Sequence, residues 1–145
     1  MSASKPANVE KAVRPASLGR VLLVEDDTVL ALALEDALLR GGADEVVICQ
    51  TMKATMAELD KREKLDAIVI DVHLADRDDG WALAELVTLL GPKRPRIAFS
   101  TGSPGDIPAQ IAELGPIFEK PYDPERLVEV LASGRKRGLF ARLLR

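Results

Sequence analysis

The stretch VLLVEDD, residues 21–27, joins a short apolar run to three consecutive acids. A continuous apolar run of this length is typical of a strand that is buried on both faces of a parallel sheet. A second such run, AIVI at residues 67–70, ends at Asp71. Between them, VLALALEDALL at residues 29–39 carries a broad apolar stripe and predicts a helix that ends at Gly41 and Gly42, with Asp27 or Thr28 as its cap.

The alternation of strand and helix patterns continues along the chain. Further strands are predicted at residues 46–48, 96–100 and 117–118, and further helices at 52–62, 81–90, 107–114 and 124–133. In the helix at 52–62 we expect Met56 and Leu59 to point inward, and Asp123 caps the last helix with Pro124 in its first turn. Five strand–helix units in series predict an α/β fold with an open, doubly wound, five-stranded parallel sheet and helices on both faces.

The composition is that of one soluble domain. The chain has 145 residues, of which 47% are hydrophobic and 30% charged. No apolar run approaches the roughly 20 residues that span a bilayer, and residues 1–20 contain no apolar stretch that resembles a signal peptide. The single cysteine, Cys49, cannot form an internal disulfide. We therefore expect a cytoplasmic protein without stable membrane insertion.

The net charge of −3 hides a segregation of charge along the chain. Residues 135–145 carry five basic side chains and no acid, and residues 1–20 are also basic, so residues 21–134 carry a net charge of −11. An acidic body disfavours nucleic acid as a partner and suits a divalent cation. We expect a flexible leader at residues 1–18, a folded domain at 19–134 and a basic amphipathic tail at 135–145.

Polar residues follow four of the predicted strands. They are Glu25 and Asp26, then Asp71, then Ser100 and Thr101, and finally Lys120 with Pro121. Because the carboxyl ends of parallel strands meet at one edge of the sheet, we expect these residues to lie together. Carboxylates that converge repel each other unless a cation or a proton intervenes.

This combination of residue types predicts phosphoryl transfer. Mg²⁺ prefers one or two carboxylates, several waters and a phosphate oxygen. A carboxylate can also act as a nucleophile and form an aspartyl phosphate, while a metal and a lysine neutralise the transferring group. Asp71 stands alone at its strand end, opposite the acidic pair, and is the better candidate for the nucleophile.

Four stretches, RVLLVEDD, DAIVIDVHLADRDDG, IAFSTG and EKPYDPERL, resemble the receiver domains of bacterial two-component response regulators from about Arg20 to Ser133. The resemblance implies a flavodoxin-like fold with strand order 2-1-3-4-5. It also implies that Asp71 accepts a phosphoryl group from a histidine kinase or phosphotransfer protein. Mg²⁺ would then be held by Asp71, by Asp26 directly, by Glu25 through water and by the backbone carbonyl of His73.

The same resemblance assigns the remaining site residues. Lys120 would pair with the phosphate, Pro121 would follow in the cis form, and Thr101 would bond a phosphoryl oxygen. Ser100 remains an alternative to Thr101, which we favour because Gly102 follows it. His73 is the only histidine and is expected to line the site with its side chain, where it and Ser103 could tune the attack of water on the phosphoaspartate.

The chain also departs from the family pattern. The family has a proline four residues and a glycine eight residues after the acceptor. This chain has Ala75 at the first of these positions and a glycine one place late, at Gly80, so the loop after Asp71 carries an extra residue. Ile117 occupies the position of the aromatic switch residue. The Gly- and Pro-rich stretch at residues 102–116 is short for the fourth helix of the family.

The sequence therefore predicts a single-domain receiver that is a switch rather than an enzyme and signals to a downstream target protein by contact. A degenerate receiver, which acts as a phosphorylation-independent adaptor, is the alternative. A phosphatase with an aspartyl intermediate usually has a second acid where this chain has His73. A nucleotide or flavin binder is disfavoured because no glycine-rich loop follows the first strand.

Overall fold

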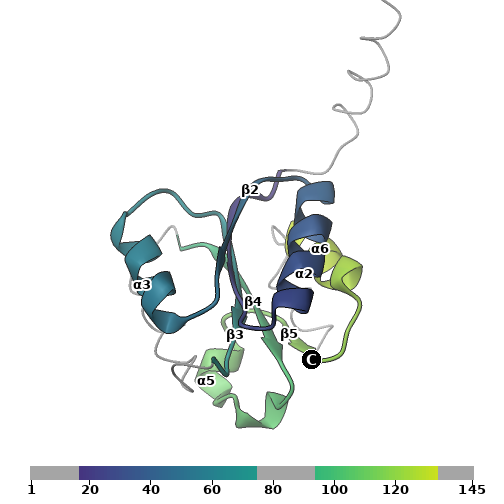
Figure 1. Ribbon diagram of the computed structural model, residues 1–145. Coiled ribbons are helices and arrows are strands. Elements are labelled where there is room, and N and C mark those ends of the chain that lie inside the picture. Colours follow the sequence, from purple (N-terminus) through teal and green to yellow (C-terminus); the bar gives the residue numbers. More distant parts are fainter. Residues whose placement is uncertain (1–16, 75–93, 134–145) are drawn as a thin grey trace, which may run out of the picture.

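Five parallel strands form the centre of the computed structural model, which describes residues 17–74 and 94–133 (Figure 1). The strands are β1 Gly19–Val24, β2 Ala43–Cys49, β3 Ala67–Asp71, β4 Arg96–Thr101 and β5 Ile117–Glu119. They lie in the order β2-β1-β3-β4-β5, and every described pair of neighbours is parallel. The predicted fold class and strand order are confirmed.

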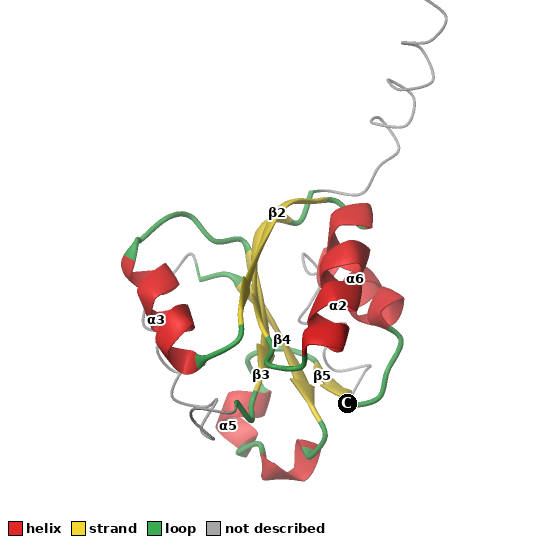
Figure 2. Ribbon diagram, viewed as in Figure 1, coloured by secondary structure: helices red, strands yellow, loops and turns green. Residues whose placement is uncertain are grey.

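Helices cover both faces of the sheet. They are α2 Thr28–Arg40, α3 Met52–Asp60, α5 Ala109–Ala112 and α6 Pro124–Ala132, with a short 3₁₀ turn at Pro104–Asp106. Helices α2 and α6 lie on one face, and α3 and α5 lie on the other (Figures 1 and 2). The helix predicted at residues 81–90 falls outside the described residues. No helix in residues 17–74 and 94–133 is long and apolar enough to cross a membrane.

The alternation of side chains along the strands divides the core into two layers. Val21 and Leu23 of β1 face the α2 and α6 side, where they join Leu34 and Leu127. The intervening strand residues Leu22 and Val24 pack with the side chains of α3 and α5 instead. Both sets are fully buried, which explains why the strand is an uninterrupted apolar run.

Two predicted helix starts are confirmed by their caps. The Asp27 side chain accepts hydrogen bonds from the backbone N–H groups of Val29 and Leu30, at 3.0 and 3.2 Å. The Asp123 side chain accepts from the N–H of Glu125 at 3.0 Å. Each cap satisfies donors that the first helical turn leaves without a partner.

The prediction that Met56 points inward is wrong. Met56 is 38% exposed, whereas Met52 and Thr55 are buried and Leu59 is partly buried against the core. Residues 52, 55 and 59 form one stripe at helical spacing, and Met56 lies on its flank.

The predicted leader, residues 1–18, includes a residue that belongs to the folded core. Leu18 is fully buried in the layer under α2 and α6, and its N–H donates to the carbonyl of Gly42 at 3.2 Å. The folded body therefore includes Leu18, while residues 1–16 lie outside the described part of the chain.

The segment between β4 and β5 is reduced to the 3₁₀ turn and the four-residue helix α5. The helix predicted at residues 107–114 is therefore shorter than expected. It begins after Pro108 and ends at Ala112. Gly115, which follows, lies so close to β4 that an added Cβ would be 1.8 Å from the carbonyl oxygen of Ile97.

Candidate functional site

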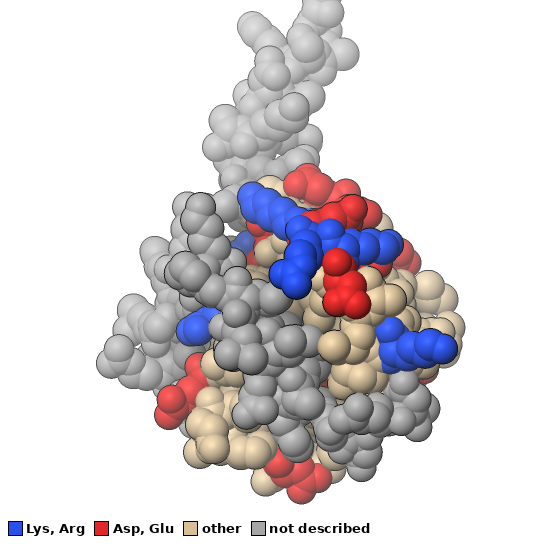
Figure 3. All heavy atoms as spheres, turned by 90° about the vertical axis from the view of Figure 1, so that its left-hand side faces the viewer, with Lys and Arg blue, Asp and Glu red and all other residues tan. Residues whose placement is uncertain are grey.

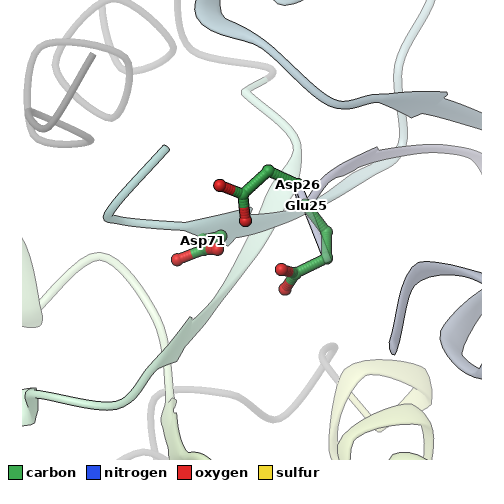
Figure 4. Close-up of side chains that lie close together, drawn as sticks. All are labelled: Glu25, Asp26 and Asp71. Carbon is green, nitrogen blue, oxygen red and sulfur yellow. The ribbon is translucent and has the colours of Figure 1, made fainter. Parts of the chain in front are cut away.

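Three carboxylates converge at the carboxyl ends of β1 and β3. These strands are neighbours, with Val24 paired to Ile70, so the next residues along each strand, Glu25 and Asp71, emerge side by side. Glu25, Asp26 and Asp71 each place a carboxylate oxygen within 4.8 Å of the others. Figure 4 shows the three side chains at this edge of the sheet.

Lys120 lies against the two buried members of this cluster. Its Nζ is 3.1 Å from Asp71 Oδ2 and 3.1 Å from Glu25 Oε1. Burial by itself would lower the pKa of Lys120, but the charges of Asp71 and Glu25 and their hydrogen bonds outweigh it and raise the pKa. The lysine therefore carries its positive charge at neutral pH.

Glu25 is fully buried, and Asp71 is 3% exposed. Burial raises the pKa of Glu25 to about 7, and the neighbouring charge of Asp71 acts in the same direction. The N–H of Asp27, 3.1 Å from Glu25 Oε2, and the charge of Lys120 oppose this rise. The raised pKa means that the ionised form of Glu25 is disfavoured at this site, chiefly by burial, even with Lys120 beside it.

The donor set fits a hard divalent cation. Three carboxylates face a single ammonium group, and within the described residues the buried Glu25 Oε1 accepts no hydrogen bond, although Lys120 Nζ lies beside it. Oxygen donors with excess negative charge are what Mg²⁺ prefers. The N–H of His73 donates to Asp71 Oδ1 at 3.0 Å and orients that carboxylate. The role of the His73 carbonyl remains a prediction.

The two candidate hydroxyls at the end of β4 have different surroundings. Ser100 is paired with Asp71 in the sheet register, and its Oγ is 2.7 Å from the hydroxyl of Tyr122. Thr101 Oγ1 accepts a hydrogen bond from the N–H of Ser103 at 3.0 Å. Accepting this bond does not engage the proton of the Thr101 hydroxyl, which can still donate to an anion.

Other predicted residues lie around this site. The peptide bond between Lys120 and Pro121 is cis, as the resemblance implies. Ile117 packs against the apolar layer on the α3 and α5 side of the sheet. His73 Nε2 lies 3.6 Å from Asp106 Oδ2, in the turn after β4. Ala75 and Gly80 fall outside the described residues.

Sequence reasoning missed Tyr122. Its hydroxyl reaches the strand end that carries the site, and its ring packs on Phe118 with centroids 5.6 Å apart. An aromatic residue two positions after Lys120 is visible in the sequence, but the contact with Ser100 depends on how the loop before α6 returns to β4.

A family model described as response regulator receiver domain matches residues 21–132. The chain belongs to this family. The described strands and the acidic cluster lie within or directly beside the matched region, so the fold and the family agree.

Solved structures of receiver domains are similar to this receiver domain. A CheY-like receiver domain from Methylobacillus flagellatus has 26% sequence identity and a TM-score of 0.68, and the match covers 81% of this chain and 98% of that one. The response regulatory domain of mrkE from Klebsiella pneumoniae, at 23% identity and a TM-score of 0.67, matches 86% of this chain and 98% of its own. The second likeness shows the fold alone. No curated protein matches the sequence.

Proposed function

We propose that this receiver domain accepts a phosphoryl group on Asp71 and acts as a phosphorylation-dependent switch. The observation that carries the proposal is the position of Asp71, a buried carboxylate at the end of β3 with Lys120 Nζ at 3.1 Å and two further acids beside it. This arrangement provides a nucleophile, a fixed cation and a set of metal ligands in one place.

Asp71 would attack the phosphorus of a phosphohistidine on the donor protein. A bond forms between a carboxylate oxygen and phosphorus, the P–N bond breaks, and the histidine leaves as the neutral ring after taking up a proton. The hydrogen bond from the His73 N–H and the contact with Lys120 hold the two carboxylate oxygens of Asp71 in place. Such positioning supplies much of the acceleration of phosphoryl transfer.

Lys120 would neutralise negative charge on the incoming phosphoryl oxygens, and Thr101 would donate a hydrogen bond to one of them. The Lys120 ammonium is already next to Asp71, and the Thr101 hydroxyl is at the adjacent strand end with its proton able to donate. Glu25, Asp26 and Asp71 are the side chains that would hold Mg²⁺, which when bound offsets the negative charge of the cluster and of the phosphoryl group. We assign Ser100 no contact with the phosphoryl group because its hydroxyl bonds Tyr122.

The partners follow from this chemistry. The donor is a histidine kinase or a phosphotransfer protein in the cytoplasm, and the phosphorylated form signals by contact with a downstream protein. New bonds from the phosphoryl oxygens to Thr101 and Lys120 would shift an existing equilibrium between two surface conformations. Because the phosphoryl acceptor, Asp71, is part of the domain, the domain needs no separate pocket for an acceptor molecule.

The direct test is incubation with Mg²⁺ and acetyl phosphate, followed by intact-mass measurement. We expect one phosphate adduct in the wild type and none in Asp71→Asn. Asp36→Asn is the matched control, because the Asp36 side chain is 67% exposed and its ion pair is with Arg40, on the outer surface of α2. An adduct that persists in Asp71→Asn would move the chemistry to another residue. Absence of any adduct in the wild type would favour the phosphorylation-independent adaptor.

A further inference from the structure

A pair of hydroxyl groups joins the end of β4 to the loop that precedes α6. Ser100 Oγ and the Tyr122 hydroxyl oxygen are 2.7 Å apart, and either can be the donor. Ser100 is fully buried, and Tyr122 is partly buried against the core under α2 and α6. Burial raises the pKa of Tyr122, so its hydroxyl remains protonated at neutral pH. Losing one partner would leave a buried polar group unsatisfied, which is unfavourable.

Lys120 lies within the segment that this pair fastens. The Lys120 N–H donates to the carbonyl of Thr101 at 2.7 Å, and two residues later Tyr122 bonds Ser100. The segment 120–122 is therefore attached at both ends to the last two residues of β4. Ser100 is also the residue that pairs with Asp71 in the sheet. One short stretch of β4 thus fixes the position of Asp71 and of Lys120 relative to each other.

We propose that Tyr122 is a positioning residue, whose hydroxyl bond to Ser100 holds the Lys120 ammonium against Asp71. The inference rests on the proposed function, because it assigns Tyr122 a role in that reaction. A cation that stabilises a transferring phosphoryl group acts through its placement, so a small displacement of Lys120 lowers the rate more than it lowers the binding of a donor. The role of Ser100 is then to anchor Tyr122.

The test uses three variants and one control. Tyr122→Phe keeps the ring that packs on Phe118 and removes only the hydroxyl. Ser100→Ala removes the other partner, and the double variant removes both. Thr55→Val is the control, because it also removes a buried hydroxyl, one that lies in α3 and donates to the carbonyl of the N-cap residue Thr51 at 2.8 Å.

The first measurement is the rate of phosphorylation of Asp71 by acetyl phosphate at saturating Mg²⁺. We expect Tyr122→Phe and Ser100→Ala each to lower the maximal rate about five- to tenfold, the size of effect that one lost hydrogen bond gives. The acetyl phosphate concentration at half-maximal rate should change little. The double variant should be no slower than either single variant, because both act through one bond. Thr55→Val should lower the melting temperature and leave the rate unchanged.

The second measurement does not depend on phosphorylation. Hydrogen exchange of the Lys120 backbone amide, followed by NMR, reports how firmly the segment is held on Thr101. We expect faster exchange in Tyr122→Phe and in Ser100→Ala and no change in Thr55→Val. If the wild type takes no phosphate while exchange behaves as expected, the proposed function fails and the holding of Lys120 by Tyr122 stands.

The inference is overturned by any of three results. The phosphorylation rates of the single variants could stay within twofold of the wild type while melting temperatures fall, which would make the pair structural only. The effects of the two substitutions could add, which would separate their actions. Exchange of the Lys120 amide could be unchanged in Tyr122→Phe, which would show that Tyr122 does not hold this segment.

Discussion

Two clusters of charged side chains lie at opposite ends of β1. At the start of the strand, Arg20 pairs with Glu58, with Glu45 at 3.2 Å and with Glu63 at 3.2 Å. At the end of the strand, Lys120 pairs with Glu25 and Asp71. Acids outnumber bases in both clusters. The number of charges therefore does not distinguish them.

The burial of the acids in excess of the bases distinguishes them, because the side chains of Arg20 and Glu58 are 16% and 13% exposed and pair with each other. The side chains of Glu45 and Glu63 are 59% exposed, and water solvates their charges. In the site, the side chains of Glu25 and Asp71 are 1% and 4% exposed. Figure 3 shows the face on the α3 side of the molecule, where described basic and acidic side chains lie next to one another on the surface. Only the buried cluster is left with negative charge that needs a cation or a proton.

The sharpest contrast between the two ends is expected when each cation is removed. Lys120→Met should lower the rate of phosphorylation by acetyl phosphate by about a hundredfold, because it removes the fixed positive charge beside Asp71. Arg20→Met should leave this rate unchanged and lower the melting temperature, since Arg20 lies at the other end of the strand. Equal rates for Lys120→Met and the wild type would contradict the role of Lys120.

The second contrast concerns pH. The pKa of Glu25 is about 7 in the folded state against 4.5 for the free group, so the folded state binds this proton more tightly. Glu25 should therefore make the protein less stable as the pH rises from 4.5 to 7, by up to about 3 kcal/mol without Mg²⁺. The measurement is urea unfolding of wild type and Glu25→Gln across this pH range. The difference between their free energies of unfolding should shrink when Mg²⁺ is added. A difference that does not vary with pH would show that Glu25 is ionised throughout.

A smaller effect is expected from the metal itself. At Mg²⁺ concentrations about ten times the Kd, binding to the folded state alone should add about 1.4 kcal/mol and raise the melting temperature by a few degrees. Asp26→Asn should abolish this rise, and Glu63→Gln, at the other end of β1, should keep it. Thermal melts with and without Mg²⁺ decide this, and an equal rise in both variants would place the metal elsewhere.

The smallest effect is expected at the exposed pair. Glu45→Gln should change the free energy of unfolding by less than about 0.5 kcal/mol. The Glu45 carboxylate is exposed, and its ion pair with Arg20 is little more favourable than its solvation by water. Chemical unfolding at low and high salt is the measurement. A larger loss would mean that the Arg20 cluster is more strongly coupled than its exposure indicates.

Much of the fold was predictable because local patterns agree with it. The runs at residues 21–24 and 67–70 are apolar throughout, and both of their faces are covered in the structure. The caps Asp27 and Asp123 act within two or three residues of themselves. The exposure of Met56 depends on how α3 packs on the sheet and was not predictable from the local pattern, nor was the early end of α5.

For the site, the sequence by itself determined which residue types stand at the strand ends, because each buried apolar run is short and the polar residue that ends it is adjacent in the chain. It identified Glu25, Asp26, Asp71 and Lys120, which the structure brings together. Only the tertiary structure decided that the Ser100 hydroxyl bonds Tyr122 and that the pKa of Glu25 rises. The physical reason is that burial and long-range hydrogen bonds depend on how separate elements pack, and spacing along the chain does not encode that packing directly.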